Sequence, residues 1–146
     1  MSWAPITWIF LHSFSFKVNE EYFNNNKSTC FQIVNYICQN LPCPMCQSHA
    51  TKYLKDHSLY ICKTKEDFKN YIWTFHNSVN YRLKKQIFDY KDLEMYKFSN
   101  FDKISYIFLI EFKKPYYYGR TMSSWQRKNV SNNLYQYFYN NWAHYS

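Results

Sequence analysis

The sequence predicts an all-α protein whose first 90 residues form a four-helix bundle. Apolar residues recur there with helical spacing, and no convincing alternating strand pattern interrupts them. The chain of 146 residues also contains a single glycine, Gly119. A Rossmann G-x-G-x-x-G turn and a P-loop both need several glycines, so neither nucleotide-binding motif is present. A nucleotide cofactor would have to be held between the side chains of helices.

Two helices are expected before the first proline-rich stretch. The first spans residues 3–17, where Pro5 suits the opening turn. Its inward-facing stripe has the spacing i, i+3, i+4 and i+8 and consists of Ile6, Ile9, Phe10 and Phe14. A run of three asparagines then interrupts the pattern. Ser28 or Thr29 caps a second helix, which ends near Pro42 because proline cannot continue it.

Two more helices complete the expected bundle. The third begins at about Pro44, a position where a helix tolerates proline, and runs to about Asp56. The fourth follows Thr64 and runs to about Lys85. Acidic residues in its first turn and lysines in its last turn complement the helix dipole. Four antiparallel helices joined by short links pack as a bundle.

The periodicity weakens after residue 89. Residues 92–98 are expected as a short helix and residues 114–120 as a turn. Residues 102–112 fit either a helix or a buried strand, because periodicity cannot separate the two in so short an apolar run. Residues 128–142 are rich in Asn and Tyr and are expected to be helical.

Charge and hydropathy narrow the class of partner. The formal net charge is +8, but the basic residues are scattered in runs no longer than two, so no nucleic-acid partner is expected. No stretch reaches the ~18 apolar residues of a membrane helix. The apolar N-terminus lacks a basic segment and a cleavage site, and is not expected to be a signal peptide. We therefore expect a cytoplasmic, reducing location, where a Cys-x-x-Cys is more often catalytic or metal-binding than structural.

The motif Cys43-Pro-Met-Cys46 lies at the start of the third expected helix. Unsatisfied N–H groups and the helix dipole stabilise a thiolate there, which favours redox exchange. The alternative is a zinc-stabilised helical binding module that uses Cys43, Cys46 and His49 as ligands. That site would need a fourth ligand, and no second Cys-x-x-Cys exists. The three single cysteines, which are expected to be inert core thiols, are Cys30, Cys38 and Cys62.

Polar side chains also fall on inward-facing helix stripes. In the fourth helix His76, Val79, Asn80 and Leu83 share one face. A buried His and Asn are costly unless they are hydrogen-bonded, and a polar aromatic ligand would satisfy them together. In the first helix an indole and an imidazole lie one turn apart, at Trp8 and His12. The polar stripe of the fourth helix favours a bound flat ligand over a dry core. The Trp8–His12 pair fits equally a stacking wall and a helix that buries its Trp with the His at the rim.

These motifs resemble the Erv/ALR family of FAD-linked sulfhydryl oxidases. The family pattern is a Trp-x-x-x-His near the start, a Cys-x-x-Cys often followed by His, and then H-N-x-V-N-x-x-L-x-K. The matching segments here are Trp8 to His12, Cys43 to His49, and His76 to Lys85. The last is the most specific, because it matches at every defined position. The resemblance covers residues 3–90.

The resemblance implies an FAD-binding four-helix bundle with a short fifth helix, usually a homodimer. It implies a core at residues 1–98 and a divergent extension at 99–146, packed on the core or at a dimer interface. Cys43 would face a protein dithiol, and Cys46 would pass electrons to FAD and then to dioxygen, giving hydrogen peroxide. The positions implied to line the cofactor are Trp8, His12, His49, Trp73, His76, Asn77, Val79, Asn80, Leu83 and Lys85.

The chain also departs from the family pattern. Many cellular members carry a Cys-x16-Cys staple, and here Trp73 and Tyr90 occupy those two positions. No shuttle cysteine follows Cys62. The substrate is therefore expected to reach Cys43 directly, as a small thioredoxin-like or other Cys-x-x-Cys protein. This minimal form is similar to the short members encoded by large cytoplasmic DNA viruses, which implies the host cytoplasm or the virion.

Overall fold

The computed structural model describes residues 2–115 and 123–145, and within them every regular element is helical. The seven α-helices are α1 (Trp3–Lys17), α2 (Glu20–Asn25), α3 (Lys27–Gln39), α4 (Pro44–Asp56), α5 (Lys65–Arg82), α6 (Phe101–Lys113) and α7 (Ser124–Asn141). Three short 3-10 segments are η1 (Leu59–Ile61), η2 (Tyr90–Phe98) and η3 (Trp142–His144). The predicted all-α class is confirmed. No helix in the described ranges is both long enough and apolar enough to cross a membrane.

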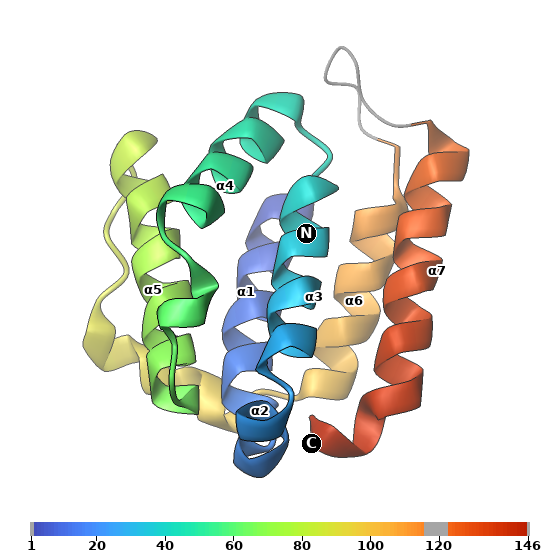
Figure 1. The fold of residues 1–146 in the computed structure, drawn as a ribbon. Coiled ribbons are helices and arrows are strands. Elements are labelled where there is room, and N and C mark those ends of the chain that lie inside the picture. Colours follow the sequence, from blue (N-terminus) through green and yellow to red (C-terminus); the bar gives the residue numbers. More distant parts are fainter. Residues whose placement is uncertain (1, 116–122, 146) are drawn as a thin grey trace.

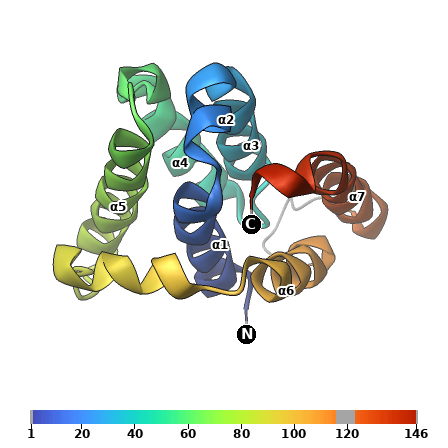
Figure 2. The same ribbon diagram turned by 90° about the horizontal axis from the view of Figure 1, so that it is seen from below.

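Helix α1 is the central element of the fold. Most of its residues are buried on all sides, as expected for a helix surrounded by others. It packs against α5 on one side and α6 on the other, while η2 crosses its end (Figure 2). Helix α4 packs against α3 (Figure 1). The functional motifs on α1, α4 and α5 therefore share one half of the molecule.

The C-terminal helices share the same hydrophobic core. Phe10 of α1 stacks on Phe108 of α6, with ring centroids 4.4 Å apart, and lies 5.1 Å from Phe138 of α7. Arg127 of α7 is fully buried and donates to the backbone oxygens of Phe112 and Asn40. The apolar run at 102–112, which fitted either a helix or a strand, is helix α6. Of the turn expected at 114–120, residues 116–120 lie outside the described residues.

Three details differ from the sequence-based expectations. Helix α2 was not expected, and it forms because the Asn19 side chain accepts a hydrogen bond from Tyr22 N–H at its start. The following helix begins at Lys27, so its capping position is Asn26 rather than the predicted Ser28 or Thr29. The expected short helix at 92–98 is the 3-10 segment η2, which starts two residues earlier.

The fourth helix ends earlier than expected. Helix α5 stops at Arg82 rather than near Lys85, because Lys84 adopts a left-handed conformation with φ of 56°. The N–H of Lys85 then donates to Asn80 O at 2.8 Å, and the N–H of Lys84 donates to Tyr81 O at 3.2 Å. This pair of bonds is a Schellman cap. It turns the chain sharply and returns the segment after residue 84 to the side of α5.

Candidate functional site

Helix α4 presents the Cys-x-x-Cys motif at its N-terminus. Cys43 is the capping residue, and its Sγ accepts a hydrogen bond from Cys46 N–H at 3.3 Å. Pro44 begins the helix, where its missing N–H costs nothing. Both thiols are free and half-buried, whereas Cys30, Cys38 and Cys62 are free and buried. The motif is therefore the only accessible pair of thiols among the described residues.

The two thiols of the motif differ in their surroundings. Burial, together with the hydrogen bond and charge of Cys43, raises the pKa of Cys46 to about 12. The guanidinium of Arg82 opposes this rise. Arg82 comes from the last turn of α5, and it also contacts Nδ1 of His49, one turn along α4. Cys46 therefore lies on the side of α4 that faces α5.

A pocket of about 190 Å³ lies between α4 and α5 beside this contact. Its lining residues are His49, Lys52, Tyr53, Asp56, His57, Phe75, Ser78, Val79 and Arg82. Flat rings form one wall, since Tyr53 stacks on His57 at 4.2 Å and on Phe75 at 4.6 Å between centroids. Two of the sequence-predicted cofactor positions, His49 and Val79, line this pocket.

A second group of predicted residues meets between α1 and α5. Trp8 stacks on His76 with centroids 4.3 Å apart and planes 10° apart. His12 Nε2 lies 2.9 Å from His76 Nδ1, so one ring donates to the other. Trp8 also packs edge-on against Phe75 at 5.1 Å, and Phe75 faces the α4–α5 pocket. The rings of both groups thus form one continuous wall.

Burial keeps both imidazoles neutral near pH 7. It lowers the pKa of His12 to about 3, with help from His76, and lowers the pKa of His76 to about 4, with help from the Lys85 charge. The Nδ1 atom of His12 is buried with no hydrogen-bond partner. A buried polar atom without a partner is costly, so this atom marks a place where a polar ligand would bind favourably.

The segment after α5 closes over the imidazole pair. The Asn77 side chain donates to Phe88 O at 2.9 Å and accepts from Phe88 N–H at 2.8 Å. Trp73 Nε1 donates to the same carbonyl at 2.9 Å. Trp73 and Tyr90 meet edge-to-face with centroids 5.2 Å apart. The hydrogen bonds to Phe88 and the Trp73–Tyr90 contact therefore hold this segment against α5.

The closing segment contributes rings that the sequence motifs did not identify. Tyr96 of η2 stacks on His12 with centroids 4.7 Å apart and planes 15° apart, and Phe88 lies 5.6 Å from His12. Tyr53, Phe75 and Arg82 at the α4–α5 pocket were missed as well. These residues lie at undefined motif positions or in weakly periodic segments, so only their position in the fold reveals them.

Three predicted positions lie outside both the pocket lining and the stacked rings. Leu83 follows the last residue of α5 and is 51 % exposed. Asn80 is buried, and its Nδ2 donates to Asn77 Oδ1 at 3.2 Å, so it supports the closing segment. The backbone N–H of Lys85 completes the helix cap, and its charge helps to lower the pKa of His76. The role of each residue in cofactor binding stays a prediction.

The zinc alternative finds no support in the part of the chain that the structure describes. No three His, Cys, Asp or Glu side chains lie close enough there to hold a metal ion. His49 is engaged by Arg82 instead of completing a set with Cys43 and Cys46. A zinc-stabilised binding module is therefore not favoured.

Comparison with known proteins decides the family. The model of the Erv1 / Alr family matches residues 5–100, which include the Cys-x-x-Cys motif and both groups of rings. The chain belongs to the Erv1 / Alr family. The resemblance identified from the three motifs is confirmed. The family match ends before α6, so α6 and α7 lie outside it.

Three curated relatives of this chain are FAD-linked sulfhydryl oxidases from isolates of African swine fever virus. An FAD-linked sulfhydryl oxidase of African swine fever virus, Kenyan pig isolate, is 32 % identical over 120 residues, covering 82 % of this chain and 95 % of the relative. The oxidase of the Malawi tick isolate is 33 % identical over 108 residues, which cover 73 % of this chain and 89 % of the relative. The oxidase of the Namibian warthog isolate is 31 % identical over 120 residues, which cover 82 % of this chain and 95 % of the relative.

Proposed function

We propose that this chain is an FAD-linked sulfhydryl oxidase that introduces disulfide bonds into protein dithiols. One observation carries the proposal. The accessible Cys43–Cys46 pair lies at the helix end beside a pocket whose ring wall continues to the buried His12–His76 pair. A dithiol and a flat-ligand site are thus side by side. The family match and the names of the viral relatives support the same activity.

The residues at the site suit FAD by their chemistry. Stacked rings, including Tyr53, Phe75 and Trp8, suit a planar ring system. The unpartnered Nδ1 of His12 offers a hydrogen bond in a buried position. Arg82 and Lys85 supply positive charge for a pyrophosphate. FAD, when bound, would accept two electrons from the cysteine pair and deliver them to dioxygen, giving hydrogen peroxide.

The protein's own part of the reaction is thiol–disulfide exchange. A substrate thiolate attacks Cys43 Sγ of the oxidised pair, which forms a mixed disulfide and releases Cys46 as a thiolate. The second substrate thiolate attacks the substrate sulfur of that mixed disulfide. The substrate leaves as a disulfide, and both cysteines are then reduced. Two electrons have moved from the substrate to the pair, and the two protons of the substrate thiols end on the reduced cysteines.

The asymmetry of the pair follows from its surroundings. Cys43 is the capping residue at the very start of α4, whereas Cys46 lies near Arg82, which lines the α4–α5 pocket. This arrangement supports Cys43 as the sulfur that receives the substrate and Cys46 as the sulfur next to the cofactor. Since the pKa of Cys46 is raised, that thiol must lose its proton before it gives up electrons. The Arg82 charge favours this loss.

The partner, the assembly and the location are part of the proposal. No cysteine follows Cys62 in this sequence, and the proposed substrate that reaches Cys43 directly is a small thioredoxin-like or other Cys-x-x-Cys protein. We expect a homodimer in the host cytoplasm or the virion. Helices α6 and α7 would belong to an extension packed on the residue 1–98 core.

The test uses the full chain purified with its cofactor. We expect a yellow protein with flavin absorbance that consumes oxygen in the presence of dithiothreitol. Cys46→Ser should abolish oxygen consumption while FAD remains bound, and Cys62→Ser, at a buried thiol outside the motif, should leave it nearly unchanged. A colourless protein, or a Cys46→Ser variant with full turnover, would contradict the proposal.

A further inference from the structure

A second pocket lies between α6 and α7, which lie on the other side of α1 from α5 (Figure 1). It has a volume of about 290 Å³, near the lower end of the ~300–1,000 Å³ of small-molecule sites. Its eight lining residues are Asp102, Ser105, Tyr106, Leu109, Tyr135, Phe138, Tyr139 and Trp142. All of them lie beyond residue 100, where the family match ends. It shares no lining residue with the α4–α5 pocket, so it is separate from the proposed flavin site.

The sequence explains why a hollow forms between these helices. The lining residues of α6 have the spacing i, i+3, i+4 and i+7 from Asp102, and those from Tyr135 to Trp142 repeat it. Two facing stripes of this kind normally fill the space between two helices. Ser105 is the one small side chain on its stripe, opposite large rings. The space that a larger residue would fill is left open.

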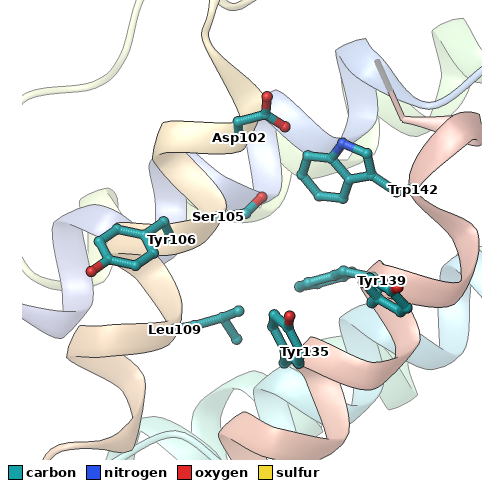
Figure 3. A pocket seen from close by; sticks show the side chains of 8 residues that line it. Asp102, Ser105, Tyr106, Leu109, Tyr135, Tyr139 and Trp142 are labelled. Atoms are coloured by element: carbon teal, nitrogen blue, oxygen red, sulfur yellow. The ribbon is translucent and has the colours of Figure 1, made fainter.

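Ser105 also supplies the polar feature that points to a ligand. Its residue is only 4 % exposed, and its Oγ is buried without a hydrogen-bond partner. Figure 3 shows the hydroxyl directed into the space between Asp102 and Trp142. Buried hydroxyl groups are almost always hydrogen-bonded, so an unpaired one beside a cavity is a place where a hydrogen bond to a ligand would be favourable.

The charge of the lining selects the kind of ligand. The whole chain carries +8, yet none of the eight lining residues is Lys, Arg or His, and one is a carboxylate. Among the described residues Asp102 forms no ion pair. Tyr135, Tyr139 and Trp142 add aromatic rings, whose faces attract cations. A carboxylate and a hydroxyl beside such rings suit a cation that carries hydrogen-bond donors, such as an ammonium group.

We propose that the α6–α7 pocket binds a small organic ammonium ion with an apolar body, such as an aralkyl amine. The ammonium group lies between the Asp102 carboxylate and the Ser105 hydroxyl, at the end of the pocket next to Trp142. The apolar body lies along Leu109 and Tyr135. This binding is independent of the oxidase activity, because no residue of the cysteine or imidazole groups lines the pocket.

Calorimetric titration of the full-length, FAD-loaded protein tests the proposal. The probes are phenethylamine and hydrocinnamate, which have similar size and opposite charge. We expect saturable binding of phenethylamine, about tenfold tighter than that of hydrocinnamate. Asp102→Asn should bring the two affinities within about twofold, because it removes the charge and keeps the shape. Lys103→Gln, on an exposed neighbour that does not line the pocket, should retain the tenfold preference.

A cavity-filling variant separates this pocket from any other binding place. Ser105→Leu should abolish phenethylamine binding while flavin absorbance and oxygen consumption stay at their original level. If phenethylamine gives no saturable heat, or binds equally well after Ser105→Leu, the proposal is wrong. The proposal also fails if hydrocinnamate binds as tightly. A further outcome also overturns it: phenethylamine does not bind, and sedimentation shows a dimer that Tyr139→Glu dissociates. The face of the pocket is then a contact between two copies of the chain.

Discussion

The contact between Asn77 and Phe88 gives the sharpest test of how the site is held together. The Asn77 side chain makes hydrogen bonds with both backbone groups of Phe88 and accepts a third from Asn80 Nδ2. These bonds keep the segment after α5 against the imidazole pair. We predict that Asn77→Ala will destabilise the protein and weaken its hold on FAD, because it frees that segment.

The expected size follows from these contacts. Three partly buried hydrogen bonds at ~1 kcal/mol each give about 3 kcal/mol. The Phe88 carbonyl keeps a second donor, Trp73 Nε1, which reduces the loss. Alanine is also a better helix former than asparagine by roughly 0.5 kcal/mol. The net destabilisation should be about 2 kcal/mol, or a fall in Tm of roughly 4–8 °C for a domain of this size.

The assay is urea unfolding at a fixed concentration of FAD, together with the rate of FAD release into excess buffer. Asn70→Ala is the control, because Asn70 lies on the same helix and accepts one exposed hydrogen bond from Tyr90. We expect the control to change stability by less than ~0.5 kcal/mol. If Asn77→Ala also changes the free energy of unfolding by less than ~0.5 kcal/mol and leaves the rate of FAD release unaltered, these bonds do not hold the segment in place.

Two further predictions concern the helix end and the imidazoles. Lys84→Gly should stabilise the protein by roughly 0.5–1 kcal/mol in thermal unfolding, because glycine adopts the observed φ of 56° without strain; a loss of stability would contradict the cap. His12 and His76 have folded pKa values near 3 and 4, below the ordinary 6.5, so the folded state binds fewer protons than the unfolded chain. Their contribution to stability should therefore be complete above about pH 6.5 and fall as the pH drops toward 4. His76→Gln should flatten that slope in pH-dependent urea unfolding, and an unchanged slope would contradict it.

Much of the fold could be predicted because its signals are local. Pro44 at a helix start and the cap at Thr64, which the structure shows as a reciprocal capping box, depend only on neighbours along the chain. The end of α5 was misplaced because lysine rarely adopts a left-handed conformation, so Lys84 gives no signal in the sequence. The helical state of residues 102–112 required the partner that this segment packs against, namely α1.

The sequence by itself determined the helical class, the position of the Cys-x-x-Cys motif and the family, because periodicity, spacing and residue type are properties of the chain alone. Only the tertiary structure decided which side chains meet. It joined Trp8 and His12 of α1 to His76 of α5, added Tyr96 from an irregular segment, and left Leu83 exposed. It also opened a second pocket around Ser105. Such contacts depend on how helices that are distant in sequence pack together, and that packing is settled by the whole core.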